Sequence, residues 1–381
     1  MNKKALLALS ISSALLTSSV NAANKIADAR GNAMGNTGVA SADYLTAPFY
    51  NPALGASFRD DDDFAILVPA VAASIYDVDD SLTTLDDLQT AIEDFESSGS
   101  TNVNALNRID GYLDELQGNA DLTVTVGLGF AIALPTKAVS TNLFARGYME
   151  VVADMDISGD VNPVNRYTDS TVDMLAFGYA EMGLSLAKEF TIANEKVSFG
   201  ITPKYQKMTT YAQRASVEDF DIEDYDKSEI TKSAFNVDLG AMWYKGNVRA
   251  GLAVKDLFAQ EIEANNNRGL TDTYKLDTQV TLGLAYVSDY FTAAFDADLT
   301  KQTRFQNRDD DTQFLRAGIE GNAWGWAQLR AGYEIDMEDT LDNSITAGIG
   351  ISPFDVVSLD LAGAYAGDNQ FAASANLAFT F

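Results

Sequence analysis

Histidine and cysteine carry much of the acid–base, nucleophilic and metal chemistry of proteins, and this sequence of 381 residues contains neither. Their absence removes the usual proton shuttle, the thiol nucleophile, disulfide bonds and metal sites built from these side chains. Carboxylates remain, but no pair of Asp or Glu residues stands out from the general run of acidic positions. We therefore expect no catalytic residues, no cofactor and no enzymatic activity.

The acidic run Asp60–Asp63 is the one stretch whose residue types suit a metal ion, because hard cations such as Ca²⁺ prefer carboxylate oxygens. It lacks the glycine and the ligand spacing of a calcium loop, so we expect a solvated turn and no metal site. The formal net charge of -29 argues against nucleic acid as a partner, since phosphates would be repelled.

Charged residues of both signs recur at alternate positions in segments that resemble β-strands. Alternate residues of a strand point to the same face, so these side chains are expected to share an inner face. They form either a network of ion pairs that holds the structure together or a selectivity filter. The candidates for this polar network are Arg249, Asp296, Arg316, Arg330 and Glu334.

One predicted strand places Phe144, Tyr148 and Val152 on the same inner face. An apolar patch among polar residues is unexpected in a water-filled pore, and it suits a pocket for a small hydrophobic ligand. Packing against another part of the chain would explain the same residues. Both alternatives stay open at this stage.

The strands that must position these residues alternate over long stretches, as in Leu122–Leu134 and Phe371–Phe381. A slip in the alternation between Tyr179 and Met182 predicts a β-bulge. We predict an all-β protein, a transmembrane antiparallel β-barrel of about 14 strands, at about 63–76, 121–134, 138–154, 171–189, 196–208, 232–244, 248–257, 275–287, 290–301, 312–321, 325–336, 344–352, 355–365 and 370–381.

The connections between these strands support a membrane barrel. Those after even-numbered strands are short, whereas those after odd-numbered strands are mostly long, polar and acidic. Outer-membrane barrels alternate short periplasmic turns with long extracellular loops in this way, and a soluble sandwich has no reason to do so. Helical spacing within the connection after the first strand predicts two amphipathic helices at about 81–96 and 103–117. This extracellular helical hairpin either covers the barrel mouth or offers a surface that docks a partner or captures a ligand.

The N-terminus resembles a secretory signal peptide. Lys3 and Lys4 precede the apolar stretch 5–16, and Val20-Asn21-Ala22 suits a cleavage site, so residues 1–22 are expected to be removed. Residues 23–62 are rich in glycine and alanine and fit neither strand nor helix well. We expect a compact N-terminal plug there, followed by the barrel at 63–381 with its helical insert at 81–117.

The motif Asn51-Pro52-Ala53, after a Gly/Ala-rich opening and before the first strand, resembles the FadL family of outer-membrane channels for hydrophobic compounds. More narrowly, the chain looks like the TraF-like barrel family named after plasmid-transfer proteins. The first resemblance implies a plug, a lumenal pocket and passive uptake of a small hydrophobic compound. The second implies a non-transport scaffold in conjugation or in the assembly of surface structures.

The last strand ends in Phe379-Thr380-Phe381, with both phenylalanines on the apolar face. The chain here resembles bacterial outer-membrane barrels, whose final strand typically ends in Phe and is recognised by the insertion machinery. The resemblance places the protein in the outer membrane of a Gram-negative bacterium. Its expected partners are outer-membrane lipids, lipopolysaccharide and the barrel-assembly machinery.

Overall fold

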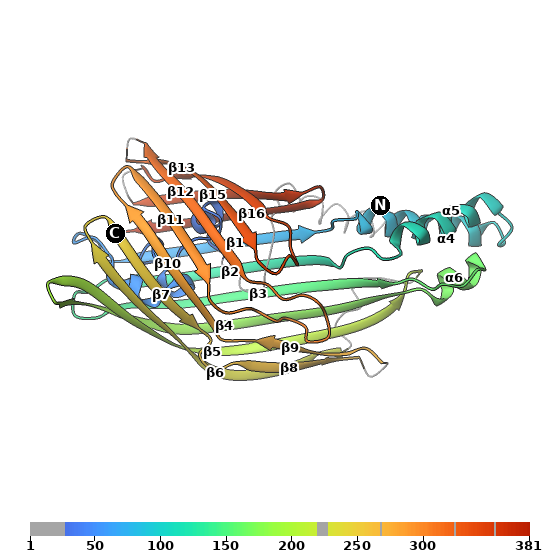
Figure 1. Ribbon diagram of the computed structural model, residues 1–381, viewed down its shortest axis with the longest axis horizontal. Coiled ribbons are helices and arrows are strands. Elements are labelled where there is room, and N and C mark those ends of the chain that lie inside the picture. The colour runs from blue at the N-terminus through green and yellow to red at the C-terminus, as the bar shows by residue number, and fades with distance from the viewer. Residues whose placement is uncertain (1–26, 219–227, 267–268, 324, 354–355) are drawn as a thin grey trace.

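Fourteen antiparallel strands form a closed barrel (Figure 1). The computed structural model describes residues 27–218, 228–266, 269–323, 325–353 and 356–381, so the predicted signal peptide lies outside the described residues. Around the wall the strands follow the order β1-β16-β15-β14-β13-β12-β11-β10-β7-β6-β5-β4-β3-β2, with the first and last paired. The predicted all-β class and transmembrane barrel are confirmed.

The bounds of the elements are as follows. The wall strands are β1 (Ala65–Tyr76), β2 (Leu122–Leu134), β3 (Ser140–Asp156), β4 (Thr171–Ile192), β5 (Glu195–Ser216), β6 (Ile230–Lys245), β7 (Val248–Lys255), β10 (Gln279–Val287), β11 (Phe291–Asp298), β12 (Phe314–Ala323), β13 (Ala327–Asp336), β14 (Ser344–Ile351), β15 (Val357–Gly367) and β16 (Gln370–Thr380). Strands β8 (Gln260–Asn265) and β9 (Thr271–Leu276) form a separate hairpin. The helices are α2 (Ala29–Ala33), α3 (Ala47–Tyr50), α4 (Ser81–Ser97), α5 (Val103–Leu116) and α6 (Pro163–Asp169), with the 3-10 helix η1 (Pro52–Ala56).

In most strands the alternation separates an apolar outer face from a polar inner face. In β2, Val126, Leu128 and Phe130 point outward and are 44–51% exposed. Thr125 of the same strand points inward and is 2% exposed. An apolar outer face is compatible with lipid, and pairing around the closed wall satisfies the backbone polar groups of the strands. In the described part of the chain, no helix has the length and apolarity needed to cross a membrane.

The β-bulge expected between Tyr179 and Met182 is wrong. The pairing of β4 with β3 runs in one register from Ser140↔Ala187 to Asp156↔Thr171. Tyr179 therefore faces inward and is 5% exposed, whereas Met182 faces outward and is 61% exposed. The apparent slip arose because inward and outward positions both carry apolar residues near Tyr179. A register shift lies instead in β1 between Leu67 and Ala70, around Pro69, which has no N–H for the ladder.

Strands on one side of the barrel are far longer than a bilayer requires. A tilted transmembrane strand needs about 9–11 residues, but β4 and β5 each have 22. We call the end of the barrel that carries the long connections the loop end, and the other the turn end. The long strands extend past the short ones at the loop end (Figure 1).

Helices α4 and α5 cover the outward face of these extensions. Leu122 faces outward yet is only 7% exposed, because it lies in one apolar cluster with Leu88, Ile109 and Leu113 of the two helices. Ile75 and Val124 pack against the same cluster. The hairpin thus shields outward apolar side chains of the wall at the loop end.

The hairpin β8–β9 and the helix α6 were not anticipated from the sequence. Each of the two strands has 6 residues and α6 has 7. Such short segments give too little periodicity to distinguish them from a polar loop. The hairpin contacts β5 and β6. It also places apolar side chains in the lumen, where they pack against inward residues of the wall.

Candidate functional site in the barrel lumen

Residues 27–57, which we call the inner segment, lie inside the barrel and are tied to its wall by hydrogen bonds. Asp296 on β11 accepts bonds from the backbone N–H groups of Gly38 (2.8 Å) and Val39 (2.9 Å). On β12, Glu320 accepts the guanidinium of Arg30 at 2.9 Å. Thr346 on β14 accepts from the N–H of Gly35 at 2.8 Å. Further hydrogen bonds join the inner segment to the side chains of Asn142, Ser198, Lys255 and Asn376 in the wall.

The motif Asn51-Pro52-Ala53 sits where two wall strands approach the inner segment closely. The Asn51 side chain accepts from the N–H of Ala53 (3.1 Å) and donates to the carbonyl of Val39 (3.0 Å), which fixes the start of η1. A Cβ atom added at Gly240 would lie 2.0 Å from Asn51 Oδ1, and one at Gly200 would lie 2.3 Å from the carbonyl carbon of Pro52. Glycine at these two inward positions therefore allows the motif to seat.

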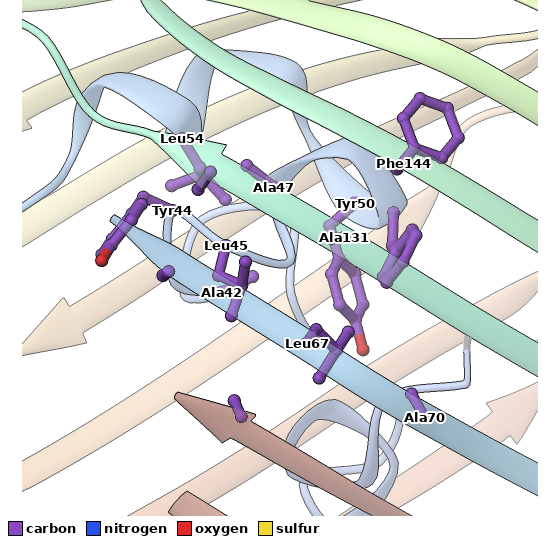
Figure 2. Packing of buried hydrophobic residues seen from close by; sticks show 14 of the residues in the cluster. Ala42, Tyr44, Leu45, Ala47, Tyr50, Leu54, Leu67, Ala70, Ala131 and Phe144 are labelled. Atoms are coloured by element: carbon purple, nitrogen blue, oxygen red, sulfur yellow. The ribbon is translucent and has the colours of Figure 1, made fainter. Parts of the chain in front are cut away.

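The face of the inner segment toward β1 and β2 is apolar. Leu67, Ala70 and Ala131 of the wall pack with Tyr44 and Leu45 in one buried cluster (Figure 2). Its hydrogen bonds to the wall, by contrast, go to β3, β5–β7, β11–β14 and β16. The inner segment is thus held by polar contacts around most of the wall and by apolar packing along β1 and β2.

Four of the five residues proposed for the polar network lie together with the inner segment. Arg316 pairs with Glu334 (2.8 Å) and Asp298 (2.9 Å). Arg330 pairs with Glu320 (2.7 Å), the carboxylate that also holds Arg30. Asp296 contacts the inner segment as described above.

Arg249, the fifth, is placed differently. Its guanidinium carbon lies 5.8 Å from the centroid of the Tyr244 ring, and it is not a member of the ion pairs just described. Burial disfavours a charge there, and the aromatic face offers partial compensation.

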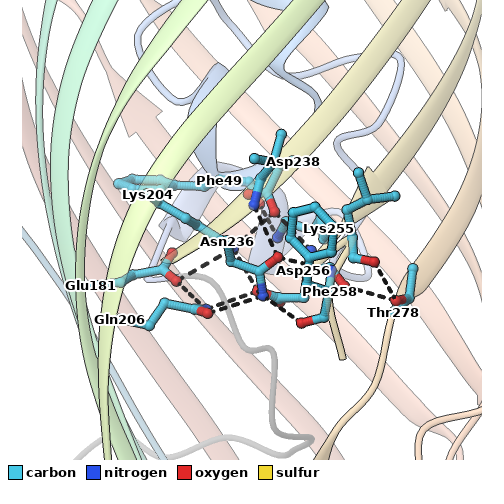
Figure 3. A network of polar contacts seen from close by, with 12 residues as sticks. Phe49, Glu181, Lys204, Gln206, Asn236, Asp238, Lys255, Asp256, Phe258 and Thr278 are labelled. Carbon is cyan, nitrogen blue, oxygen red and sulfur yellow. Dashed lines mark hydrogen bonds and ion pairs between the residues drawn. The ribbon is translucent and has the colours of Figure 1, made fainter. Parts of the chain in front are cut away.

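A second set of buried charges forms a layer across the inner faces of β3–β7 (Figure 3). Lys204, whose side chain is 0% exposed, lies 2.8 Å from Asp256 and 2.9 Å from Asp238. Arg146 pairs with Glu181 in the same layer, and Lys255 donates to the carbonyl of Phe49 in the inner segment. Alternation along the strands marks most of these positions as inward, but only tertiary structure brings them into contact.

The three residues proposed for an apolar pocket divide between two environments. Phe144 packs edge-on against Phe49 of the inner segment, with centroids 6.1 Å apart. Tyr148 and Val152 lie farther toward the loop end, in an aromatic cluster with Phe177, Tyr179 and the hairpin β8–β9. The Tyr148 and Tyr179 rings stack at 5.7 Å. The sequence therefore placed these residues inside the barrel, but it did not separate their surroundings.

The mouth at the loop end is crossed by the connection from β11 to β12, residues 299–313, which we call the strap. A cavity of about 410 Å³ lies between the strap and the wall and is lined by Tyr76, Asn119, Ala120, Asp121, Thr123, Val152, Asp154, Arg304, Asn307, Arg308, Asp309, Asp310, Thr340 and Leu341. Burial raises the pKa of Asp310 to about 6, although the Arg304 charge opposes that rise.

The inward residues of β3 show the order of these layers from the turn end to the loop end. Phe144 meets the inner segment, Arg146 belongs to the charged layer, Tyr148 to the aromatic cluster, and Val152 to both that cluster and the mouth cavity. At about 3.3 Å per residue, the strand covers roughly 26 Å between Phe144 and Val152. The lumen is therefore occupied by apolar, charged and aromatic layers in turn.

Known structures share this architecture at low sequence identity. The structure titled "CymD monoaromatic hydrocarbon channel" is 11% identical, with a TM-score of 0.53, and the match covers 92% of this chain and 96% of that one. A mutant of the TodX monoaromatic hydrocarbon channel is 13% identical, with a TM-score of 0.52 over 92% of this chain and 97% of that one. At this identity the likeness concerns the barrel fold alone.

No curated protein is similar enough in sequence to match the chain. A family model does match it, with the description "F plasmid transfer operon, TraF, protein". The match covers residues 48–298, which is more than half of the chain and runs from the end of the inner segment through β11. The chain therefore belongs to this TraF family.

Proposed function

We propose that the protein is an outer-membrane channel of a Gram-negative bacterium for the passive uptake of small hydrophobic compounds. The observation that carries the proposal is the aromatic cluster inside the lumen. Tyr148 and Phe177 lie on the inner face of the wall, where a water-filled pore would be polar, and Tyr274 of the hairpin β8–β9 stacks on Phe177. The solute enters from the loop end, outside the cell, and leaves at the turn end into the periplasm.

Release requires a shift of the inner segment. Each hydrogen bond to the wall contributes about 1 kcal/mol, so breaking all of them at once would be rare. A partial shift along β1 and β2 separates mainly alanine and leucine side chains and leaves the polar ties in place. We therefore assign the release route to the side of the inner segment that faces these two strands.

The other partners follow from the same location. The outward apolar faces of the strands meet outer-membrane lipid. The acidic connections at the loop end would lie beside anionic lipopolysaccharide, where divalent cations offset the repulsion. The phenylalanines Phe379 and Phe381 would present the assembly signal to the barrel-assembly machinery.

A second function is favoured by two observations: the lumen is filled by the chain's own side chains at several levels, and the family is named after a plasmid-transfer operon. A barrel that is closed in this way also suits a non-transport scaffold for conjugation or for the assembly of surface structures. The two functions differ in whether the inner segment has to move.

Deleting residues 24–50 distinguishes them. The deletion should leave a folded, heat-modifiable barrel, because the strand ladder does not depend on the inner segment. Uptake of a fluorescent hydrophobic probe by intact cells should change at least severalfold for a channel. The matched control is Asp86→Ser together with Asp87→Ser, on the exposed face of α4 far from the lumen. Unchanged uptake with a folded barrel, especially with altered plasmid transfer, would favour the scaffold.

A further inference from the structure

The strap reaches across the whole mouth of the barrel. It leaves the wall at β11 and returns at β12, yet its side chains contact β3 and the residue before β2. Around the fourteen-strand wall, β3 lies seven strands from β12 in either direction. The strap therefore spans the diameter at the loop end, above the aromatic cluster.

Two arginines fasten the strap to the opposite wall. Arg308 donates to Asp121 at 2.7 Å and lies 3.7 Å from Asp154. Arg304 donates to Glu150 on β3 at 3.1 Å, and these two side chains are 4% and 0% exposed. Both arginines also line the mouth cavity, so the same contacts that fasten the strap close one side of that cavity.

Between these arginines the strap inserts an aromatic ring into the lumen. Phe305 is fully buried and packs edge-on against Tyr274, with centroids 5.1 Å apart and planes at 80°. Tyr274 in turn stacks face-to-face on Phe177 of the wall, with centroids 3.6 Å apart. Edge-to-face and stacked rings are the arrangements that aromatic groups prefer, so Phe305 fills a position suited to a flat apolar ring.

We propose that the strap is the outer gate of the lumen and that Phe305 is its built-in occupant. A solute with a flat aromatic ring takes the place of Phe305 against Tyr274. The strap lifts when both of its ion pairs, Arg308 to Asp121 and Arg304 to Glu150, break. This inference rests on the proposed channel function for its physiological meaning, but the gate itself is a property of the folded barrel.

The chain contains no cysteine, so a single engineered thiol can report opening. Ala264→Cys places it on β8, where the native side chain is 0% exposed and packs within the aromatic cluster. The purified full chain in lipid nanodiscs is labelled with a water-soluble maleimide. The fully exposed reporter Ser100→Cys, in the α4–α5 connection, corrects for changes in reagent reactivity.

Arg308→Glu should speed labelling of the Ala264→Cys reporter by roughly fivefold, the factor expected when a partly exposed ion pair is lost. Adding Asp121→Arg restores the ion pair with its two charges exchanged, so the labelling rate should return toward its starting value. An unchanged labelling rate in Arg308→Glu, or no reversal in the double variant, would show that the Arg308–Asp121 ion pair does not hold the strap closed. Reversal also excludes misfolding as the cause.

Toluene and cyclohexane test the occupant. Toluene should accelerate labelling of the reporter more than cyclohexane, which is similar in size but is not a flat ring. Equal effects, or none, would overturn the replacement of Phe305. The labelling rates do not depend on transport. If probe uptake is lost while labelling still responds to the Arg308–Asp121 pair, only the channel function is refuted. If uptake occurs while labelling does not respond to that pair, only the gate is refuted.

Discussion

At the scale of single residues, two glycines of the wall allow the inner segment to pack closely against it. The Asn51-Pro52-Ala53 motif comes within contact of the wall only because Gly200 and Gly240 have no Cβ atoms. The same motif shares its asparagine between Val39 of the inner segment and Ala241 of the wall. A short sequence motif and two distant glycines thus act as one packing unit.

Gly240→Val should disturb this unit without opening the barrel wall. The new Cβ would lie 2.0 Å from Asn51 Oδ1, so η1 must move, and overpacking of this kind costs about 1–3 kcal/mol. The expected result is a lower midpoint of thermal unfolding, measured by heat-modifiable electrophoresis, together with altered probe uptake.

Gly363→Val is the matched control for Gly240→Val. Its added Cβ would meet only the carbonyl of Ala372, at an ordinary 3.6 Å. Equal midpoints for the two variants would show that the close approach at Gly240 is unimportant for stability.

Deleting Phe381, or replacing it with Asp, should reduce assembly more than stability. Phe381 is 60% exposed on the outer face, and its backbone still pairs with Asp63 and Phe64. One partly exposed aromatic side chain contributes a few kcal/mol at most, which is small beside a closed ladder of hydrogen bonds. Cells should therefore contain less of the folded, heat-modifiable form, while the purified variant still refolds in detergent.

Thr380→Ser should leave both the Phe381 assays unchanged, since it keeps the hydroxyl. Normal membrane levels of the Phe381 deletion would mean that the terminal aromatic is not part of an assembly signal.

At the scale of elements, strand length explains the helices. Because β3 and β4 extend past the membrane, their outward apolar residues need cover from water, and α4 and α5 provide it. The acidic outer faces of these helices then meet solvent. The two helices lie beyond the ends of β1 and β2 (Figure 1), whereas the strap crosses the mouth itself.

Replacing residues 81–116 with a short Gly/Ser linker should expose this outer patch while β1 and β2 remain paired. Leu122 and its neighbours would meet water, and each apolar side chain uncovered costs about 1.5–3 kcal/mol. We expect a heat-modifiable barrel that binds more of an environment-sensitive apolar dye and aggregates at low detergent concentration.

Asp86→Ser with Asp87→Ser, which leaves the covered face intact, should behave like the native protein in that assay. If the linker variant bound no additional dye, the helices would not be serving as a cover.

At the scale of the whole molecule, the barrel is closed inside as well as around its wall. The inner segment, the charged layer, the aromatic cluster and the strap follow one another along the axis. A polar solute would meet the aromatic cluster, and an apolar solute would meet the charged layer. Passage of any solute therefore requires local rearrangement, which is why the tests above follow motion of the inner segment and of the strap.

The sequence by itself determined the wall of this protein. Alternation with a period of two, short turns after even strands and long connections after odd strands predicted the fourteen strands, because a barrel wall repeats one local rule at every strand. The same alternation identified inward residues such as Arg316, Arg330 and Tyr148, since facing depends only on position along a strand.

Only the tertiary structure decided how the interior is filled. The contacts that join Lys204 to Asp256, Arg304 to Glu150 and Phe305 to Tyr274 link residues on different strands and connections. They depend on barrel closure and on how far each strand extends, and no local period encodes either. For the same reason the sequence marked Phe144 and Tyr148 as neighbours on one face, whereas the fold places one against the inner segment and the other beneath the strap's aromatic ring.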